Sequence, residues 1–342
     1  MAVVMKPNAT EEDVQRVIKF IEEKYGLKVD VSRGEYQTLI GIIGDEDKVD
    51  FDRLTLFPGV ERAYRITSRY RLVARSFFPE DRVIDVKGVK IGGKNRPVFM
   101  AGPCAIESRE QIFRIAREVK EAGADILRGG AFKPRTSVHS FQGLGEKGLE
   151  FLAQAGEEYG MPTVSEVRSE RHAKLVAKYV DILQIGARNM YNQDLIEEVA
   201  RQKKPVLIKR NFGASIEEFL AFSERAVAQG NKDVILCERG IVPIGGGRQF
   251  TRYILDLNAV PVIKKETYLP IIVDPSHGTG RRDLVYSMSK AAIAAGAHGL
   301  MIETHYNPSE ALSDGPQMVL PSELKKIIAV CMKIYELNRL ED

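Results

Sequence analysis

Apolar and polar residues alternate over the first 73 positions with two different periods. Val14, Val17 and Ile21 recur at helical spacing behind Asn8 or Thr10, either of which can cap a helix that ends near Gly26. The expected elements of this part are a strand at 2–6, a helix at 10–26, a hairpin of strands at 27–34 and 37–44, a weaker helix at 47–60 and a strand at 61–73. This order is typical of the ferredoxin-like α+β arrangement.

Beyond a linker at 74–97 that includes a β-hairpin, short apolar strands alternate with amphipathic helices. Strands are expected at 98–102, 125–130, 163–167, 181–186, 205–210, 233–240, 271–277 and 298–304. Eight strand–helix units predict an α/β chain in which residues 98–342 form a (β/α)8 TIM barrel. A doubly wound open sheet is the alternative, but the units are even and the glycine-rich segment at 240–270 lacks the spacing of a dinucleotide-binding loop. That segment is expected to be irregular.

Composition changes this picture little. The 342 residues are 44% hydrophobic and 28% charged, which is usual for a globular protein. The 50 basic and 47 acidic residues leave a net charge of +3, which does not indicate a nucleic-acid or membrane partner. No apolar run approaches the roughly 20 residues of a membrane span. Cys104, Cys237 and Cys331 are too widely spaced for a disulfide framework, so a cytoplasmic location is expected.

Polar side chains follow the apolar run of every predicted barrel strand. In strand order they are Cys104; Arg128, Lys133 and Arg135; Glu166; Arg188; Lys209 and Arg210; Glu238 and Arg239; Asp274 and His277; and Glu303 and His305, with Asp314 in the last loop. The carboxyl ends of parallel strands meet at one mouth of a closed barrel, where the active sites of TIM barrels lie. The sequence therefore predicts that these side chains converge.

Four of these residues, Cys104, His277, Glu303 and Asp314, offer the sulfur, nitrogen and oxygen donors that divalent first-row metals accept. Taken singly, a buried cysteine is more often a small core residue, and Glu303 could simply pair with a barrel arginine. The four residues come at the ends of the first, seventh and eighth strands, which are neighbours in a closed barrel. That placement favours one metal site.

Six cations belong to the same predicted mouth: Arg128, Lys133, Arg135, Arg188, Lys209 and Arg239. Such a ring needs strongly anionic ligands, and phosphate and carboxylate groups match the planar fork of arginine. Together with a metal, the ring indicates a reaction between phosphorylated small molecules. A Schiff-base aldolase that uses Lys209 and a non-catalytic sugar-phosphate binding protein are the alternatives.

The motifs at these positions resemble those of the DAHP (3-deoxy-D-arabino-heptulosonate 7-phosphate) synthase family. In order they are GPC (102–104), RGGxxKPRTS (128–137), FQGLGEKGL (141–149), QIGARN (184–189), IKR (208–210), CERG (237–240), DPSH (274–277), GLMIET (299–304) and LSDGPQ (312–317). The resemblance covers residues from about 75 to 337. Residues 1–73 resemble the ferredoxin-like, ACT-like regulatory domain of some members of this family.

The resemblance implies an enzyme that condenses phosphoenolpyruvate with erythrose 4-phosphate and releases phosphate, at the start of the shikimate pathway. It implies one divalent ion, such as Mn, Fe, Co or Zn, on Cys104, His277, Glu303 and Asp314. It also implies a homotetramer that tyrosine or phenylalanine inhibits through the N-terminal domain. For that domain, a mere oligomerisation module is the alternative.

The resemblance also assigns residues to the substrates and to catalysis. Those implied for phosphoenolpyruvate are Arg128, Lys133, Ala187, Arg188, Lys209, Arg239 and Asp274, and those for erythrose 4-phosphate are Pro134, Arg135 and Thr136. The implied catalytic residues are Lys133, Glu166, Cys104 and His277, with Glu166 orienting a water and Lys133 near the reacting atoms. A sister family, 3-deoxy-manno-octulosonate 8-phosphate synthase, typically has Ala-Asn-Arg-Ser after the lysine, whereas Pro134-Arg135-Thr136 has the DAHP form.

Overall fold

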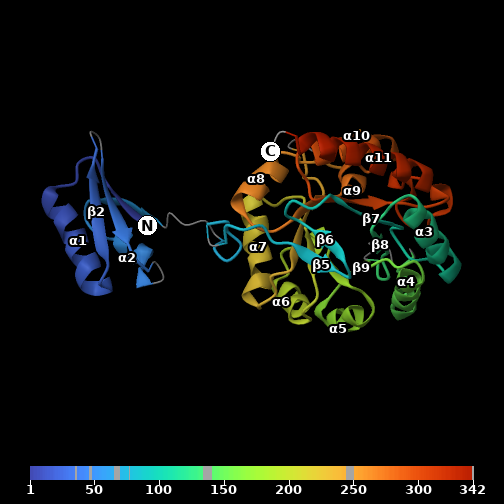
Figure 1. The fold of residues 1–342 in the computed structure, drawn as a ribbon. Helices are drawn as coiled ribbons and strands as arrows, with labels where there is room; N and C mark the ends of the chain where they lie inside the picture. The colour runs from blue at the N-terminus through green and yellow to red at the C-terminus, as the bar shows by residue number, and fades with distance from the viewer. Residues whose placement is uncertain are drawn as a thin grey trace. The chain divides into compact units, whose positions relative to one another are not determined.

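The computed structural model describes residues 1–34, 37–45, 48–64, 70–76, 78–133, 141–243 and 250–340. The chain divides into two compact units, Met1–Arg69 and Tyr70–Asp342, and each is described by itself (Figure 1). Within these described residues, no helix has both the length and the apolar character needed to cross a membrane.

The first unit is a four-stranded antiparallel sheet with two helices. Its elements are β1 (Ala2–Met5), α1 (Glu11–Tyr25), β2 (Lys28–Arg33), β3 (Thr38–Ile43), α2 (Phe51–Thr55) and β4 (Val60–Tyr64). The strand order β2-β3-β1-β4 confirms the ferredoxin-like arrangement that the sequence predicts. Helix α1 begins with a capping box, in which Thr10 and Asp13 satisfy each other's backbone amides, and it ends at Gly26 with a φ of 65°.

Helix α2 is shorter than the predicted helix over residues 47–60. It ends at Thr55, because Pro58 restricts the residue before it and Gly59 turns the chain with a φ of 77°.

The second unit contains a closed barrel of eight parallel strands, which confirms the predicted TIM-barrel class. The strands are β7 (Val98–Gly102), β8 (Ile126–Arg128), β9 (Thr163–Glu166), β10 (Ile182–Ile185), β11 (Val206–Lys209), β12 (Val234–Glu238), β13 (Ile271–Val273) and β14 (Gly299–Glu303). Strand β14 pairs with β7, so the sheet closes on itself and leaves no edge among these eight strands. This pairing sets Glu303 opposite Gly102, close to Cys104.

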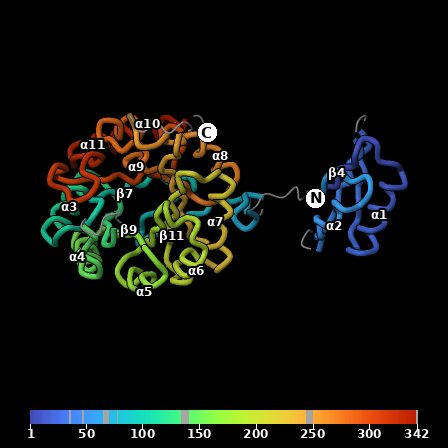
Figure 2. The backbone as a smooth tube through the Cα atoms, turned by 180° about the vertical axis from the view of Figure 1, so that it is seen from behind, coloured from blue at the N-terminus to red at the C-terminus, as the bar shows by residue number. Residues whose placement is uncertain are grey.

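Helices surround the barrel, as Figure 1 shows and as Figure 2 shows from behind. They are α3 (Arg109–Glu121), α4 (Glu146–Glu158), α5 (Glu170–Tyr179), α6 (Gln193–Arg201), α7 (Ile216–Ala228), α8 (Ala259–Glu266), α10 (Arg282–Ala294) and α11 (Pro321–Asn338), with the short helix α9 (Pro275–Thr279) after β13. The apolar faces of these helices pack against the strands in one continuous core.

A small hairpin of β5 (Ile84–Val86) and β6 (Val89–Ile91) lies over one end of the barrel (Figure 1). Ile84, Val86 and Ile91 are buried and form one apolar cluster with barrel residues such as Val98 and Ile126. Both of these barrel residues stand at the beginning of a strand. The hairpin therefore covers the amino-terminal end of the barrel.

The segment at 240–270 is partly helical, which corrects the expectation that it is irregular. Helix α8 covers Ala259–Glu266, and Pro261 lies within its first turn. Proline is tolerated there because the first amides of a helix have no partner within it. The prediction of an irregular segment rested on its glycine content, which does not extend to residues 259–266.

Candidate active site and metal centre

The carboxyl ends of the barrel strands surround a cavity of about 290 Å³. Its lining residues are Arg128, Lys133, Glu166, Arg168, Gln184, Gly186, Ala187, Arg188, Asn189, Lys209, Phe212, Arg239, Arg252, Tyr253, His277 and Asp314. Cations and hydrogen-bonding groups outnumber apolar side chains around this cavity. It therefore suits a small, strongly anionic ligand.

Three potential metal donors lie together at the edge of the cavity. The Sγ atom of Cys104 and one carboxylate oxygen each of Glu303 and Asp314 lie within 4.8 Å of one another. Cys104 Sγ is 3.1 Å from Asp314 Oδ2, and Cys104 and Glu303 are fully buried. One sulfur and two oxygens at this spacing match the donor set of a divalent first-row metal, so the chemistry of the group fits such an ion.

His277 is the fourth donor that the sequence analysis names, and its ring is held from behind. Its Nδ1 atom is 2.8 Å from Asp274 Oδ2, and its backbone amide donates to Asp274 Oδ1 at 2.9 Å. The other ring nitrogen, Nε2, lies 3.5 Å from Glu303 Oε1. A carboxylate behind a histidine fixes the tautomer and the direction of the free nitrogen. The Nε2 atom of His277 therefore faces Glu303 of the donor cluster.

The carboxylate of Glu303 is held in its ionised form. Burial alone would raise its pKa, but the facing side chains of His277, Arg128 and Lys133 lower the pKa to about 2. Arg128 donates to Oε1 at 2.8 Å, and the amide of Gln317 donates to Oε2 at 2.6 Å. Glu303 is therefore a fixed anion at neutral pH.

The thiol of Cys104 is in the opposite situation. Burial and then the charge of Glu303 raise its pKa to about 12, against the opposing charge of Lys133. A thiol becomes a metal ligand only when it loses its proton. Binding of an ion at this cluster must therefore displace the proton of Cys104.

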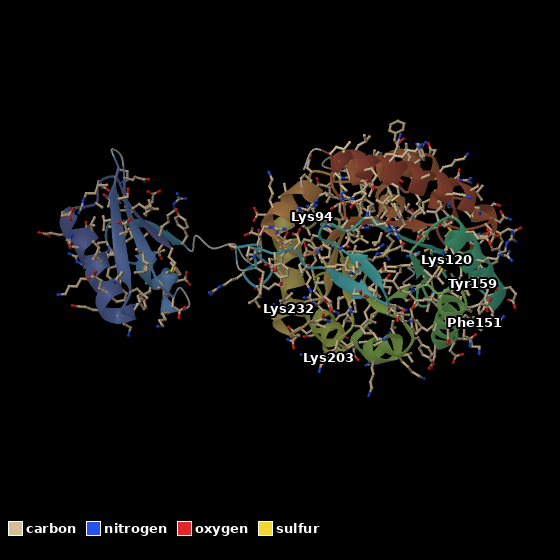
Figure 3. The ribbon with its side chains drawn as sticks, viewed as in Figure 1. Lys94, Lys120, Phe151, Tyr159, Lys203 and Lys232 are labelled. Carbon is tan, nitrogen blue, oxygen red and sulfur yellow. The ribbon has the colours of Figure 1, made fainter. Side chains whose placement is uncertain are left out.

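Four cations of the cavity are buried, unlike most lysines of the barrel, whereas Arg168 and Arg188 are exposed. Arg128, Lys133, Lys209 and Arg239 are each at most 9% exposed. In contrast, Lys94, Lys203 and Lys232, which Figure 3 labels, are exposed. Withdrawing a cation from water is unfavourable unless an anion compensates it. The buried set is therefore arranged for anionic ligands rather than for solvent.

Lys209 and Lys133 are held by different partners. Lys209 forms a buried ion pair with Asp274, and Lys133 donates to the carbonyl oxygen of Cys104 at 2.9 Å. Burial would lower the pKa of Lys133, but its electrostatic interactions with Cys104 and Glu303 raise it overall. Lys133 is therefore a protonated side chain next to the metal donors.

Glu166 ends strand β9 and lines the cavity without a cation bonded to it among the described residues. Its Oε2 atom accepts a hydrogen bond from Gln184 at 3.3 Å. A Cβ atom at Gly186 would lie 2.1 Å from Glu166 Oε1, so glycine leaves the space that this carboxylate occupies. Glu166 is thus an acceptor directed at the cavity.

The structure brings most of the predicted site residues to this cavity. Arg128, Lys133, Glu166, Ala187, Arg188, Lys209, Arg239, His277 and Asp314 line it, and Cys104 and Glu303 lie directly beside it in the metal cluster. Asp274 is fully buried behind His277 and Lys209, so it holds these two side chains rather than lining the cavity. Pro134, Arg135 and Thr136 lie outside the described residues.

Several lining residues were not identified from the sequence. They include Arg168, Phe212, Arg252 and Tyr253, and Gln317 stands behind Glu303. Arg168 comes two positions after Glu166, and residues two apart in a strand face the same side. This spacing could have predicted that Arg168 lies at the cavity. Arg252 and Tyr253 lie in a segment without periodicity, and no local pattern places them at the mouth.

Comparison with known proteins identifies relatives for both units. Residues 79–337 match the DAHP synthetase I family, and residues 1–68 match the DAHP synthase ferredoxin-like domain. The chain is 49% identical over 334 residues to a phospho-2-dehydro-3-deoxyheptonate aldolase of Thermotoga maritima, covering 96% of this chain and 97% of the relative. It is 33% identical over 264 residues to a 2-dehydro-3-deoxyphosphooctonate aldolase of Francisella tularensis subsp. holarctica, covering 72% and 94%.

Solved structures give the same result. The crystal structure of phospho-2-dehydro-3-deoxyheptonate aldolase (DAHP synthase) from Thermotoga maritima aligns with a TM-score of 0.87 at 47% identity, covering 98% of this chain and 97% of that one. A truncated form of 3-deoxy-D-arabino-heptulosonate 7-phosphate synthase from the same organism aligns with a TM-score of 0.71 at 46% identity, covering 80% and 96%. The similarity thus includes both units.

Proposed function

Because the chain belongs to the DAHP synthetase I family and carries its ferredoxin-like domain, it is an enzyme of the DAHP synthase type, and we propose that it condenses phosphoenolpyruvate with erythrose 4-phosphate at the mouth of its barrel. The observation that carries this proposal is one cavity that combines buried cations with a Cys, Glu and Asp donor cluster. Neither feature alone would distinguish the reaction from simple anion binding.

Phosphoenolpyruvate occupies the cation-rich part of the cavity in this proposal. Arg188, Lys209 and Arg239 bind its phosphate, with the backbone amide of Ala187 as a further donor at the first residue of a short 3-10 helix. Arg128 lies close to the donor cluster and contacts the carboxylate end. Asp274 contributes indirectly, because it pairs with Lys209 and holds the His277 ring.

Erythrose 4-phosphate places its aldehyde near Lys133 and the donor cluster. Its phosphate is assigned to Pro134, Arg135 and Thr136, which lie outside the described residues. Arg135 and Thr136 follow Lys133 directly in the chain, so two anionic groups are held at a set separation.

Cys104, His277, Glu303 and Asp314 would hold one divalent ion, which when bound supplies Lewis-acid polarisation of a carbonyl oxygen. Asp274 and Gln317 orient two of these donors from behind. Mn, Fe, Co and Zn all accept this mixed donor set.

The remaining residues of the chain handle protons and water. C3 of phosphoenolpyruvate forms the new bond to the aldehyde carbon, and the protonated Lys133 is placed to deliver a proton to the aldehyde oxygen. Glu166 orients a water that adds to C2 of the former phosphoenolpyruvate, and phosphate then leaves by cleavage of its C–O bond. The sum is one water consumed and one phosphate released for each carbon–carbon bond formed.

The N-terminal domain gives this enzyme a second, regulatory role in the proposal. Tyrosine or phenylalanine binds the ferredoxin-like unit and inhibits the barrel, and the enzyme acts as a cytoplasmic homotetramer. The match of residues 1–68 to the ferredoxin-like domain of DAHP synthases supports this.

Phosphate release tests the proposed reaction directly. The full-length enzyme is incubated with phosphoenolpyruvate and either erythrose 4-phosphate or arabinose 5-phosphate, with and without a chelator. We expect rapid phosphate release with erythrose 4-phosphate only, and its loss in chelator. Faster release with arabinose 5-phosphate would assign the chain to the octulosonate reaction, and unchanged release in chelator would exclude the metal.

Borohydride separates this mechanism from a Schiff-base aldolase. Lys209 is paired with a buried carboxylate, so we expect no covalent trapping of either substrate. Trapping that the Lys209→Arg variant abolishes would favour the aldolase mechanism instead.

A further inference from the structure

Arg239 is a buried cation that has little to hold it. It is 5% exposed, and its NH1 atom has no hydrogen-bond partner among the described residues. Its guanidinium carbon lies 4.4 Å from the centre of the Tyr253 ring. The face of an aromatic ring attracts a cation and does so more strongly away from water. The ring is therefore a support for the guanidinium group of Arg239, a residue that lines the cavity.

The ring of Tyr253 is itself held in place. It stacks on Phe212 with centroids 5.6 Å apart and planes inclined by 20°. The Tyr253 amide donates to Gly278 at 3.0 Å, and the next residue, Ile254, pairs with Ile241 in a small bridge. The stack with Phe212 therefore holds the ring, and the backbone contacts with Gly278 and Ile241 hold the segment that carries it.

Gly240 allows this close approach. It follows Arg239 directly and has a φ of 96°, and a Cβ atom there would lie 2.7 Å from Tyr253 Cβ. The absence of a side chain at Gly240 therefore lets Tyr253 pack closely beside Arg239.

A second guanidinium group lies near the same ring. The Arg252 guanidinium carbon is 5.6 Å from the Tyr253 centroid, and Arg252 NH1 donates to Gln317 at 3.3 Å. Burial would raise the pKa of Tyr253, but Arg239 and Arg252 together lower it. The tyrosine therefore lies between two cations and stabilises both.

From this arrangement we propose that Tyr253 is a positioning residue for phosphoenolpyruvate, because its ring holds the guanidinium group of Arg239 at the cavity. This inference rests on the proposed function, which places that phosphate on Arg239. Tyr253 acts through Arg239 and does not contact the reacting atoms. Holding the guanidinium group in advance removes part of the ordering cost of binding. The ring should therefore affect affinity for phosphoenolpyruvate more than the rate of the chemical steps.

Equilibrium binding isolates this effect. Calorimetry on the full-length, metal-loaded enzyme with phosphoenolpyruvate alone measures affinity without turnover. Tyr253→Leu removes the ring face, and we expect affinity to fall roughly tenfold. Tyr253→Phe keeps the ring and should stay within about threefold of the parent. The KM for erythrose 4-phosphate should change by less than about twofold in both variants.

A double-mutant cycle tests whether the ring acts through Arg239. In the Arg239→Ala background, Tyr253→Leu should cause almost no further loss of affinity for phosphoenolpyruvate, because the guanidinium group that the ring supports is gone. Phe212→Leu is a second test, since it removes the ring stacked on Tyr253 without changing the tyrosine. Its loss of affinity for phosphoenolpyruvate should be smaller, and it should also disappear in the Arg239→Ala background. Tyr286→Leu is the matched control: its ring supports Lys290 at 4.7 Å on helix α10, and neither residue lines the cavity.

The outcomes separate this inference from the proposed function. If Arg239→Ala binds phosphoenolpyruvate as tightly as the parent, the proposed phosphate clamp is wrong. If Arg239→Ala weakens binding but Tyr253→Leu does not, only the inference fails. An equal loss from Tyr253→Leu with and without Arg239 would also overturn the inference, because the ring would then act by general packing. Thermal melting of each variant confirms that the barrel is folded.

Discussion

At the scale of single residues, the donor cluster sets a condition on metal binding. Cys104 is fully buried with a pKa of about 12, whereas Glu303 has a pKa of about 2. At neutral pH the carboxylate is ready to bind an ion, and the thiol is not. The proton of one residue therefore controls the affinity of the whole cluster.

This condition leads to a prediction about proton release. Binding of Mn²⁺ to the metal-free enzyme at pH 7 should release about one proton from Cys104, so the affinity should rise about tenfold for each unit of pH. Calorimetry in two buffers with different ionisation enthalpies measures the proton count. Cys104→Ala should bind Mn²⁺ weakly and should release no proton on binding it.

The control for this measurement is Cys331→Ala, which removes another buried thiol in the core, on helix α11. Cys331→Ala should bind Mn²⁺ and release a proton as the parent enzyme does. Proton release that persists in Cys104→Ala would show that the thiol is not a ligand.

His298 gives a second prediction, on stability against pH. Burial, and then the charge of Lys264, lower its pKa from 6.5 to about 4, while the more distant charges of Asp81 and Arg75 act in opposite directions. Between these values the unfolded chain binds a proton that the folded chain resists, so the free energy of unfolding falls as the pH falls. The loss at pH 5 relative to pH 7.5 should be about 2 kcal/mol from this residue.

His298→Asn tests this effect, because asparagine can still accept the Ile271 amide that His298 Nδ1 accepts at 3.1 Å. Urea denaturation at the two pH values should show a flatter dependence in the variant by about 2 kcal/mol. Carboxylates elsewhere contribute equally to both proteins and cancel. Identical slopes for the two proteins would show that His298 is not held neutral.

Much of the site could be predicted residue by residue, because strand ends give a positional rule. Cys104, Glu303 and Asp314 each follow an apolar strand, and closure of the barrel brings them together. Tyr253 could not be predicted in this way. It reaches the cavity through its pairing with Gly278 and Phe212, which are tertiary contacts without a local pattern.

At the scale of elements, the pairing of strands β7 and β8 explains a glycine in the GPC motif. Gly102 has a φ of 147°, and a Cβ atom there would lie 2.1 Å from the carbonyl oxygen of Arg128. The two strand ends can approach closely only without a side chain. This approach places Cys104 beside the end of β8.

Gly102→Ala should therefore separate the two strand ends. We expect a loss of more than about 2 kcal/mol in the free energy of unfolding, with weaker metal binding, because the clash is with backbone that cannot move cheaply. Urea denaturation and metal titration measure the two effects. Gly213→Ala is the control, since its Cβ atom would meet only Asn211 at an ordinary 3.5 Å. Comparable stability of both variants would refute the argument.

Helical and strand periodicity predicted the elements of the barrel well, and it failed where proline was ambiguous. Pro58 and Gly59 shorten α2 to five residues, whereas Pro261 lies in the first turn of α8. The same residue type ends one helix and begins another. Its effect depends on whether the preceding amides need partners, and the sequence alone does not specify that.

At the scale of the whole molecule, the boundary between the two units follows from what packs on the barrel. The second unit begins at Tyr70, which is 6% exposed and whose hydroxyl donates to Glu266 at 2.7 Å. Val73 is fully buried, and Thr267 donates to its carbonyl oxygen. Tyr70 and Val73 therefore belong to the core of the barrel, although the sequence pattern groups them with the preceding strand.

Two truncations distinguish the regulatory role of the first unit from the structural role of these four residues. Removal of residues 1–69 should leave the barrel active and as stable as in the full chain. Removal of residues 1–73 also deletes Tyr70 and Val73, and should lower the free energy of unfolding of the barrel by about 3 kcal/mol. Both truncated enzymes should lose inhibition by tyrosine or phenylalanine if the ferredoxin-like unit binds the effector.

Phosphate-release assays with each amino acid measure the inhibition, and urea denaturation measures the stability of the barrel separately. Inhibition that survives removal of residues 1–69 would place the effector on the barrel, and equal stability of the two truncations would show that Tyr70 and Val73 are not part of its core.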